Sequence, residues 1–204
     1  MKVLYRIAHV VLGTALKTLF QFTVYGQHSL PRGKAIIAAN HQSYIDPVVV
    51  GTGIPEEICY LAREDVFTLA LLRWFCLRVN TMLIKKRHAD RSALNAVLQK
   101  LAQGRKVLVF PEGTRSYDGE LQPPERGVAL LAHRSGTPVI PAYISGTHRV
   151  LPRGGAMIRF HPISLSFGPP LRFDELSLKE GARRAYETFS LRVMEAIARL
   201  KASR

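Results

Sequence analysis

Acidic residues are scarce in this sequence. Its 204 residues include 15 aspartates and glutamates against 29 lysines and arginines, which gives a formal net charge of +14. A surface this basic attracts phosphate-rich partners, both nucleic acids and anionic membranes. The basic residues are scattered, and the sequence contains neither zinc-finger spacing nor the aromatic motifs of RNA-binding domains. We therefore expect no nucleic-acid partner.

Cysteine is also rare. The sequence has two cysteines, Cys59 and Cys76, and both lie in apolar surroundings. Buried, reduced thiols are the usual state of such residues, and a disulfide framework is not indicated. Neither cysteine has histidines at ligand spacing, so we predict no metal site.

A long uninterrupted apolar run is missing as well. Residues 1–25 start with a positive charge and continue as an apolar stretch, but His9 and Lys17 interrupt it before the roughly 20 residues that a membrane span requires. On a helical projection of about 100° per residue, one narrow arc collects Lys2, Arg6, His9, Gly13 and Lys17. A wide apolar face lies opposite, which predicts an amphipathic helix in the membrane interface. Packing of this helix on the protein's own core is the alternative.

Beyond residue 26, short apolar runs bounded by turn residues predict buried strands. They cover residues 34–40, 56–62, 81–84, 106–110 and 138–144. Segments with helical apolar spacing lie between them, at 65–79, 88–104 and 124–136. This alternation predicts a single α/β domain over residues 26–204, with a mostly parallel central sheet flanked by helices. We expect a strand pair near the sheet edge at 156–171 and a long C-terminal helix at 177–203.

A histidine and an aspartate lie five residues apart in the segment NHQSYIDP. On a continuous helix they would point about 140° apart, so they meet only if a strand ends at Asn40 and a helix starts near Asp46. Pro47 favours that start. His41 would then act as a base and Asp46 would orient its ring; the alternative is an aspartate that caps the helix beside a loop histidine. No G-x-S-x-G motif occurs, so a substrate hydroxyl is the expected nucleophile.

The predicted strand at 106–110 leads into a second polar motif, FPEGTRS. Gly113 permits a tight turn, and Glu112, Thr114 and Arg115 place polar groups near the carboxyl end of the strand, where parallel sheets bind ligands. Arg115 can bind a phosphate through two N–H groups, and Glu112 can hold a guanidinium or a substrate hydroxyl. The alternative is an ion pair between these two residues that stiffens the turn. The glycine spacing differs from that of a Walker loop, so ATP is not expected.

The sequence resembles the 1-acyl-sn-glycerol-3-phosphate acyltransferases, of the glycerophospholipid acyltransferase superfamily, in three stretches that read NHQSYID, FPEGTRS and RGVALLAHRSGTPVIPAYI. In that family the first block is N-H-x-S-x-x-D and the third is F-P-E-G-T-R-S. The second block resembles G-x-I-F-I-x-R, and its arginine is taken as a contact to the substrate phosphate. The matching stretch here is NTMLIKKR, in which Asn80 replaces the glycine and the basic residue is Lys86 by spacing or Arg87 by residue type.

This resemblance implies an enzyme that moves a fatty acyl group from acyl-CoA or acyl carrier protein to the free hydroxyl of lysophosphatidic acid. Glycerol 3-phosphate or a lyso-aminolipid is the alternative acceptor. The implied catalytic residues are His41 and Asp46, and the implied substrate contacts are Glu112, Gly113, Thr114 and Arg115, together with Lys86 or Arg87. No metal or cofactor is implied, because the thioester is already activated. The implied location is an anionic membrane surface at the cytoplasmic face, where phospholipids are made.

Overall fold

One seven-stranded sheet organises the computed structural model, which describes residues 3–63, 70–84, 89–155 and 157–203. In sheet order the strands are β1 (Thr23–Tyr25), β7 (Ser164–Phe167), β6 (Val139–Ser145), β2 (Ala35–Ala39), β5 (Lys106–Val109), β3 (Ile58–Arg63) and β4 (Thr81–Ile84). Neighbouring strands run parallel except β6 and β7, which are antiparallel. This confirms the predicted α/β domain with a mostly parallel central sheet.

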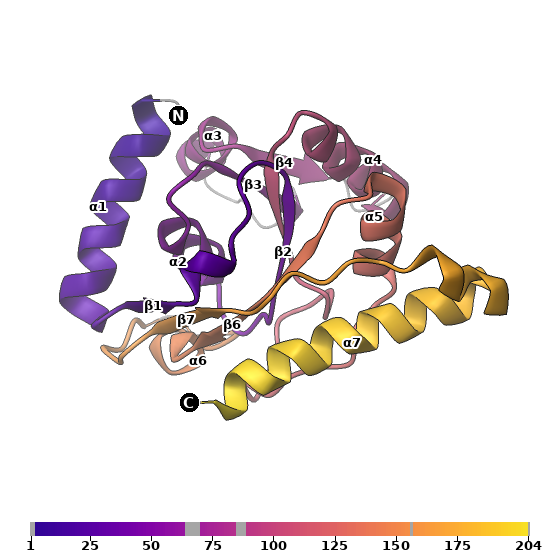
Figure 1. Cartoon of the computed structure of the whole chain (residues 1–204). Helices are drawn as coiled ribbons and strands as arrows, with labels where there is room; N and C mark the ends of the chain where they lie inside the picture. Colours follow the sequence, from indigo (N-terminus) through magenta and orange to yellow (C-terminus); the bar gives the residue numbers. More distant parts are fainter. Residues whose placement is uncertain (1–2, 64–69, 85–88, 156, 204) are drawn as a thin grey trace.

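Helices cover both faces of the sheet (Figure 1). One face carries α1 (Val3–Phe20), α2 (Asp46–Gly53) and the short α6 (Thr147–Val150). The other carries α4 (Ala89–Ala102), α5 (Gly127–Ser135) and the long C-terminal α7 (Ala182–Ala202), while α3 (Ala70–Arg78) packs beside β4. Two short 3-10 helices cover Gln27–Ser29 and Glu175–Glu180.

The central position of strand β2 explains why its sequence is apolar throughout. Ala35, Ile37 and Ala39 pack into the core under α1 and α2. Ile36 and Ala38 point the other way, into the core under α4, α5 and α7. A central strand that is covered on both faces needs a continuous apolar run, because neither set of alternating side chains meets water.

Two segments differ from the prediction. The predicted helix over residues 1–25 ends at Phe20, Gln21 takes a positive φ of 47°, and the next residues form the edge strand β1. Among the described residues of 156–171 there is one strand, β7, rather than a pair. Pro162 comes shortly before β7 and Pro169 and Pro170 shortly after it, and prolines cannot donate the main-chain hydrogen bonds that would extend a strand.

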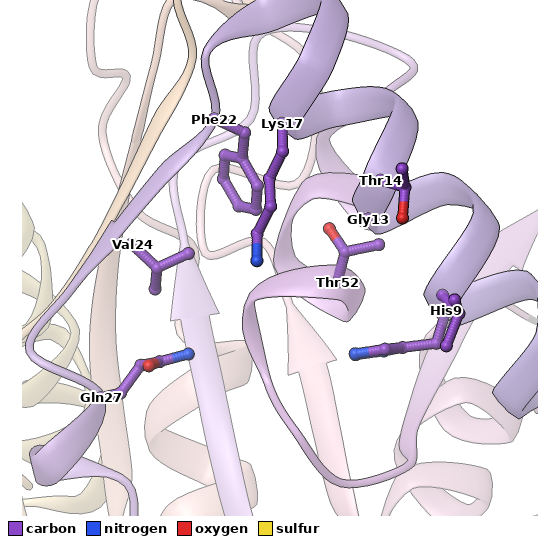
Figure 2. A pocket seen from close by; sticks show the side chains of 9 residues that line it. His9, Gly13, Thr14, Lys17, Phe22, Val24, Gln27 and Thr52 are labelled. Atoms are coloured by element: carbon purple, nitrogen blue, oxygen red, sulfur yellow. The ribbon is translucent and has the colours of Figure 1, made fainter.

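Helix α1 contacts the domain through a narrow strip of its own surface. Tyr5 and Leu16 are its buried residues, and the Tyr5 hydroxyl accepts the main-chain N–H of Ile58 at 3.2 Å. Its apolar positions Val3, Ile7, Val10, Val11 and Leu19 are each more than half exposed. Of the helices in the described part of the chain, α1 alone is long and apolar enough to cross a membrane. His9 and Lys17, from the predicted cationic arc, line a pocket between α1 and the domain (Figure 2).

Candidate active site

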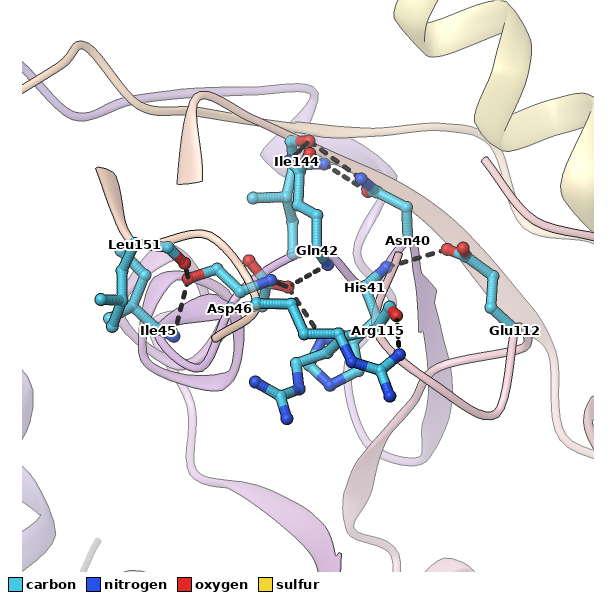
Figure 3. A network of polar contacts seen from close by, with 11 residues as sticks. Asn40, His41, Gln42, Ile45, Asp46, Glu112, Arg115, Ile144 and Leu151 are labelled. Atoms are coloured by element: carbon cyan, nitrogen blue, oxygen red, sulfur yellow. Dashed lines mark hydrogen bonds and ion pairs between the residues drawn. The ribbon is translucent and has the colours of Figure 1, made fainter. Parts of the chain in front are cut away.

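The turn between β2 and α2 brings His41 and Asp46 together (Figure 3). Nδ1 of His41 lies 2.8 Å from Oδ2 of Asp46. The same oxygen accepts the main-chain N–H groups of Gln42 at 2.7 Å and Ser43 at 2.8 Å. A carboxylate oxygen that receives these donors is an acceptor for the ring as well, so Nδ1 carries the proton and Nε2 keeps its lone pair. The pair therefore has the arrangement of a base and its orienting group, as the spacing predicted.

Asp46 does not cap α2, so the alternative interpretation as a helix cap is wrong. Ile45 occupies the N-cap position, no side chain caps the helix, and Pro47 lies in its first turn as predicted. The Asp46 side chain is fully buried and turns back into the preceding loop, because three hydrogen-bond donors converge there. The carboxylate is thus used to hold the loop and the histidine.

Polar residues around His41 anchor its loop to strand β6 and the chain beyond it. The Asn40 side chain makes two hydrogen bonds with the main chain of Ile144: its Nδ2 donates to the carbonyl at 3.0 Å, and its Oδ1 accepts the N–H at 2.7 Å. Gln42 Nε2 donates to the same carbonyl at 2.8 Å. The Ser43 hydroxyl donates to the carbonyl of Leu151 at 2.7 Å. These three supporting residues were not predicted, although all lie inside the NHQSYIDP motif.

Glu112 lies behind the main chain of His41. Its Oε1 accepts the His41 N–H at 2.9 Å and its Oε2 accepts the Gln122 N–H at 3.0 Å. Burial raises the pKa of the Glu112 carboxyl to about 7, with a smaller contribution from the charge of Asp46, while the two N–H donors act in the opposite direction. Because both oxygens are bound to the main chain and the residue is buried, the structure favours a supporting role for Glu112 over the predicted contact with substrate.

Phe110 and Gly113 shape the rest of the turn. The Phe110 ring stacks on the His41 imidazole, with ring centroids 3.8 Å apart and an angle of 11° between the planes. Gly113 has a φ of 67°, which favours glycine, and an added Cβ would lie 2.8 Å from a carboxylate oxygen of Glu125. The main-chain N–H of Ser116 donates to the carbonyl of His41 at 2.8 Å. The FPEGTRS turn and the histidine loop are therefore joined as one unit.

Two arginines stack on tyrosines beside this unit. The Arg115 guanidinium carbon lies 3.4 Å from the centre of the half-exposed Tyr44 ring. Arg153 lies 3.8 Å over Tyr117, and its Nη1 donates to the Thr114 hydroxyl at 3.1 Å and to the carbonyl of Arg115 at 2.6 Å. No motif marked Arg153, because its position depends on how the chain returns after α6. The structure thus adds a second guanidinium to the predicted one.

The remaining predicted contacts, Lys86 and Arg87, lie outside the described residues. Strand β4 ends shortly before them, at Ile84. Asn80, which replaces the glycine of the family's second block, has a φ of 65°. Asparagine adopts this left-handed conformation more readily than most residues, so it can replace the glycine without changing the turn.

Within the described ranges, no group of three or more histidine, cysteine, aspartate or glutamate side chains could hold a metal ion. The two cysteines are free thiols, with Cys59 buried and Cys76 partly buried. What the site does offer is an imidazole lone pair and two guanidinium groups at the turn that is joined to the histidine loop. It can accept a proton and bind an anion.

Comparison with known proteins identifies the family. Residues 21–145 match the family model described as Acyltransferase. The chain belongs to this acyltransferase family. The matched region holds the histidine loop and the FPEGTRS turn, which follow the adjacent strands β2 and β5.

Several relatives of this acyltransferase carry the name 1-acyl-sn-glycerol-3-phosphate acyltransferase. The protein from Bacillus subtilis (strain 168) is 27% identical over 177 residues, which cover 84% of this chain and 86% of the relative. The one from Saccharomyces cerevisiae is 30% identical over 161 residues, covering 76% and 51%, and the chloroplastic BAT2 from Brassica napus is 24% identical over 159 residues, covering 76% and 46%. The chain therefore spans about half the length of the yeast and plant relatives.

A solved structure shares the fold of this acyltransferase. The crystal structure of the 1-acyl-sn-glycerophosphate (LPA) acyltransferase PlsC from Thermotoga maritima aligns with a TM-score of 0.72 at 24% sequence identity. The alignment covers 93% of this chain and 79% of that one. The sheet and helices described above are thus an architecture that another family member also has.

Proposed function

We propose that this protein transfers a fatty acyl group from a thioester to the free hydroxyl of lysophosphatidic acid, which forms phosphatidic acid for phospholipid biosynthesis. The observation that carries the proposal is the His41–Asp46 pair, in a loop that a main-chain hydrogen bond joins to the turn where Arg115 and Arg153 lie. Family membership and the names of the relatives support the same reaction.

In the proposed reaction, Nε2 of His41 takes the proton from the acceptor hydroxyl as its oxygen attacks the thioester carbonyl. The carbon–sulfur bond then breaks, and the leaving thiolate receives that proton from His41. The carboxylate of Asp46 stabilises the imidazolium that forms between these steps, and its bond to Nδ1 fixes the orientation of the ring. The thioester is an activated acyl donor, so this chemistry requires no cofactor.

The phosphate of the acceptor would bind to Arg115 and Arg153. A phosphate monoester carries up to two negative charges, and a guanidinium offers paired N–H donors that match its oxygens. The Tyr44 and Tyr117 rings hold the two guanidinium groups in place. Thr114, which already accepts a hydrogen bond from Arg153, completes the turn. Lys86 or Arg87 remains a predicted further contact.

The position of α1 supports action at a membrane. Its outward apolar positions have no partner in the described part of the domain, whereas an interfacial helix buries such positions at the acyl boundary. The net charge of +14 strengthens the attraction to anionic lipids. We place the helix in the membrane interface rather than across it, with its boundary at Phe20 and the catalytic domain on the cytoplasmic side, where soluble acyl thioesters are found.

The decisive experiment measures free thiol release from acyl-CoA and from acyl carrier protein, with lysophosphatidic acid, glycerol 3-phosphate and a lyso-aminolipid as acceptors. We expect lysophosphatidic acid to be preferred, and His41→Ala to lower the rate on the order of 10²- to 10⁴-fold. His28→Ala, at an exposed position outside the site, is the matched control. Near-normal turnover by a folded His41→Ala protein would refute the mechanism, and preference for another acceptor would refute the proposed substrate.

A further inference from the structure

The pocket that His9 and Lys17 line lies between α1, the end of α2 and the edge strand β1 (Figure 2). It has a volume of about 470 Å³ and is lined by His9, Val10, Gly13, Thr14, Lys17, Phe22, Val24, Gln27 and Thr52. Thr52 follows Asp46 by six residues on α2, which corresponds to about 9 Å along the helix axis. The pocket is therefore at the opposite end of α2 from the catalytic pair, and none of its residues belongs to the active site.

The polar side chains of this pocket are basic or neutral. Figure 2 shows the Lys17 ammonium, the His9 ring and the Gln27 amide directed into one space from α1 and from the chain after β1. Nε2 of Gln27 donates one hydrogen to the carbonyl of Gly53 at 2.8 Å and has a second one to offer. No acidic residue lines the pocket, and Lys17 has no ion-pair partner among the residues that the structure describes. This set of donors fits an anion with several oxygen acceptors.

Apolar side chains also line the pocket. Phe22 and Val24 lie on the side of strand β1. Val10 lines the pocket and is also 59% exposed, on the apolar face of α1. A small soluble phosphate would leave these apolar groups without a partner, whereas a lipid could cover them with the first carbons of its chains.

We propose that this pocket binds the phosphate of an anionic glycerophospholipid, at a site separate from the one where the acyl group is transferred. The phosphate would lie between Lys17, His9 and Gln27, and the acyl chains would leave over Val10 toward the bilayer. A lipid bound in this way fixes both the depth and the rotation of α1 at the headgroup level. The apolar face of α1 alone could not fix them.

Sedimentation with vesicles distinguishes lipid binding in this pocket from general electrostatic attraction to an anionic membrane. We would compare phosphatidylcholine vesicles with and without phosphatidylglycerol, using the full chain and the variants Lys17→Gln, Lys17→Arg and Arg6→Gln. Arg6 is an exposed cation on the same helix that does not line the pocket, so its loss is expected to weaken binding about fivefold or less. Lys17→Gln should weaken it about tenfold or more, because a charged hydrogen bond is lost as well, and Lys17→Arg should restore most of the binding. Equal losses in Lys17→Gln and Arg6→Gln would overturn the proposal.

Nuclear magnetic resonance of the His9 ring identifies the source of the phosphate. We expect dispersed dihexanoyl phosphatidylglycerol to shift its signals and glycerol 3-phosphate at equal concentration to leave them unchanged. Equal shifts would show a site for soluble phosphate esters and overturn the lipid assignment, and no shift with either would overturn the site.

A pocket-filling variant and a catalytically disabled background complete this test. Gly13→Leu should abolish the lipid-induced shift while preserving the fold, because an added Cβ meets only Thr52, at 3.9 Å. A shift that persists in this variant would contradict the assignment. All these measurements can be made in the His41→Ala background, so failure of the proposed acyl transfer would leave their outcome unaffected.

Discussion

Replacing Glu112 by glutamine should change how the stability of the protein depends on pH. In the folded protein the pKa of this carboxyl is raised from 4.5 to about 7, chiefly by burial. At a pH between these two pKa values, the carboxyl keeps its proton in the folded state and has released it in the unfolded state. The free energy of unfolding of the wild type therefore falls as the pH rises through this window, and below about pH 4.5 the carboxyl makes no such difference.

The size of this effect follows from the two pKa values. A pKa difference of one unit corresponds to about 1.4 kcal/mol, so the rise from 4.5 to about 7 sets an upper limit of about 3 kcal/mol, and we expect about 2 to 3 kcal/mol. The glutamine can still accept the N–H of His41, but its amide nitrogen cannot accept the N–H of Gln122. The stability lost with this hydrogen bond is the same at every pH, so it can be separated from the pH-dependent effect of the buried charge.

Urea unfolding of both proteins at about pH 5 and about pH 8 measures the effect. Glu112→Gln should be destabilised relative to the wild type at the lower pH, and this destabilisation should shrink by about 2 to 3 kcal/mol at the higher pH, because only the wild type then carries a buried charge. Glu195→Gln, at an exposed position on α7, is the control and should show no such change. An equal effect of Glu112→Gln at both pH values would refute the reasoning.

Two further predictions concern the reaction. In Asp46→Asn the main-chain N–H groups of Gln42 and Ser43 should keep the amide oxygen facing His41, so the ring keeps its tautomer and only the negative charge is lost. We expect kcat to fall about 10²-fold, which is less than in His41→Ala. An unchanged kcat would contradict this prediction. Arg153→Ala should raise the KM for lysophosphatidic acid about tenfold with little change in the KM for the acyl donor, whereas an equal rise in both would argue against a phosphate contact.

The central strands and the contact between His41 and Asp46 were predictable because their determinants are local. The apolar run at 34–40 and the polar turn that follows it define both the end of β2 and the meeting of His41 with Asp46. The positions of Glu112 and Arg153 beside the histidine loop and the FPEGTRS turn were not predictable in this way. Each depends on a contact with a residue 38 or more positions away along the chain, and residue spacing alone carries no information about such contacts.

Helix α1 shows a second limit of sequence reasoning. Its periodicity predicted the cationic positions on one arc and the apolar positions on another. Periodicity does not say which arc meets the domain, because that depends on the surface the helix lands on. In the structure His9 and Lys17 line the pocket at the domain side, while Val3, Ile7 and Val11 face outward. The edge strand β1 was missed for a related reason, since its three residues acquire strand geometry only by pairing with β7, far away in sequence.

The anchoring of the histidine loop also sets when the enzyme can become active during its own synthesis. The loop emerges from the ribosome early, yet the groups that hold it come much later: Glu112, then the main chain of Ile144, then the carbonyl of Leu151. Until residue 151 has been made, the loop lacks at least one of these anchors, because the carbonyl of Leu151 holds Ser43. Helix α1 precedes the loop in the sequence and, in the proposed interfacial position, can meet the membrane before that. If the proposed function is correct, a nascent chain would therefore reach the membrane before its active site is complete.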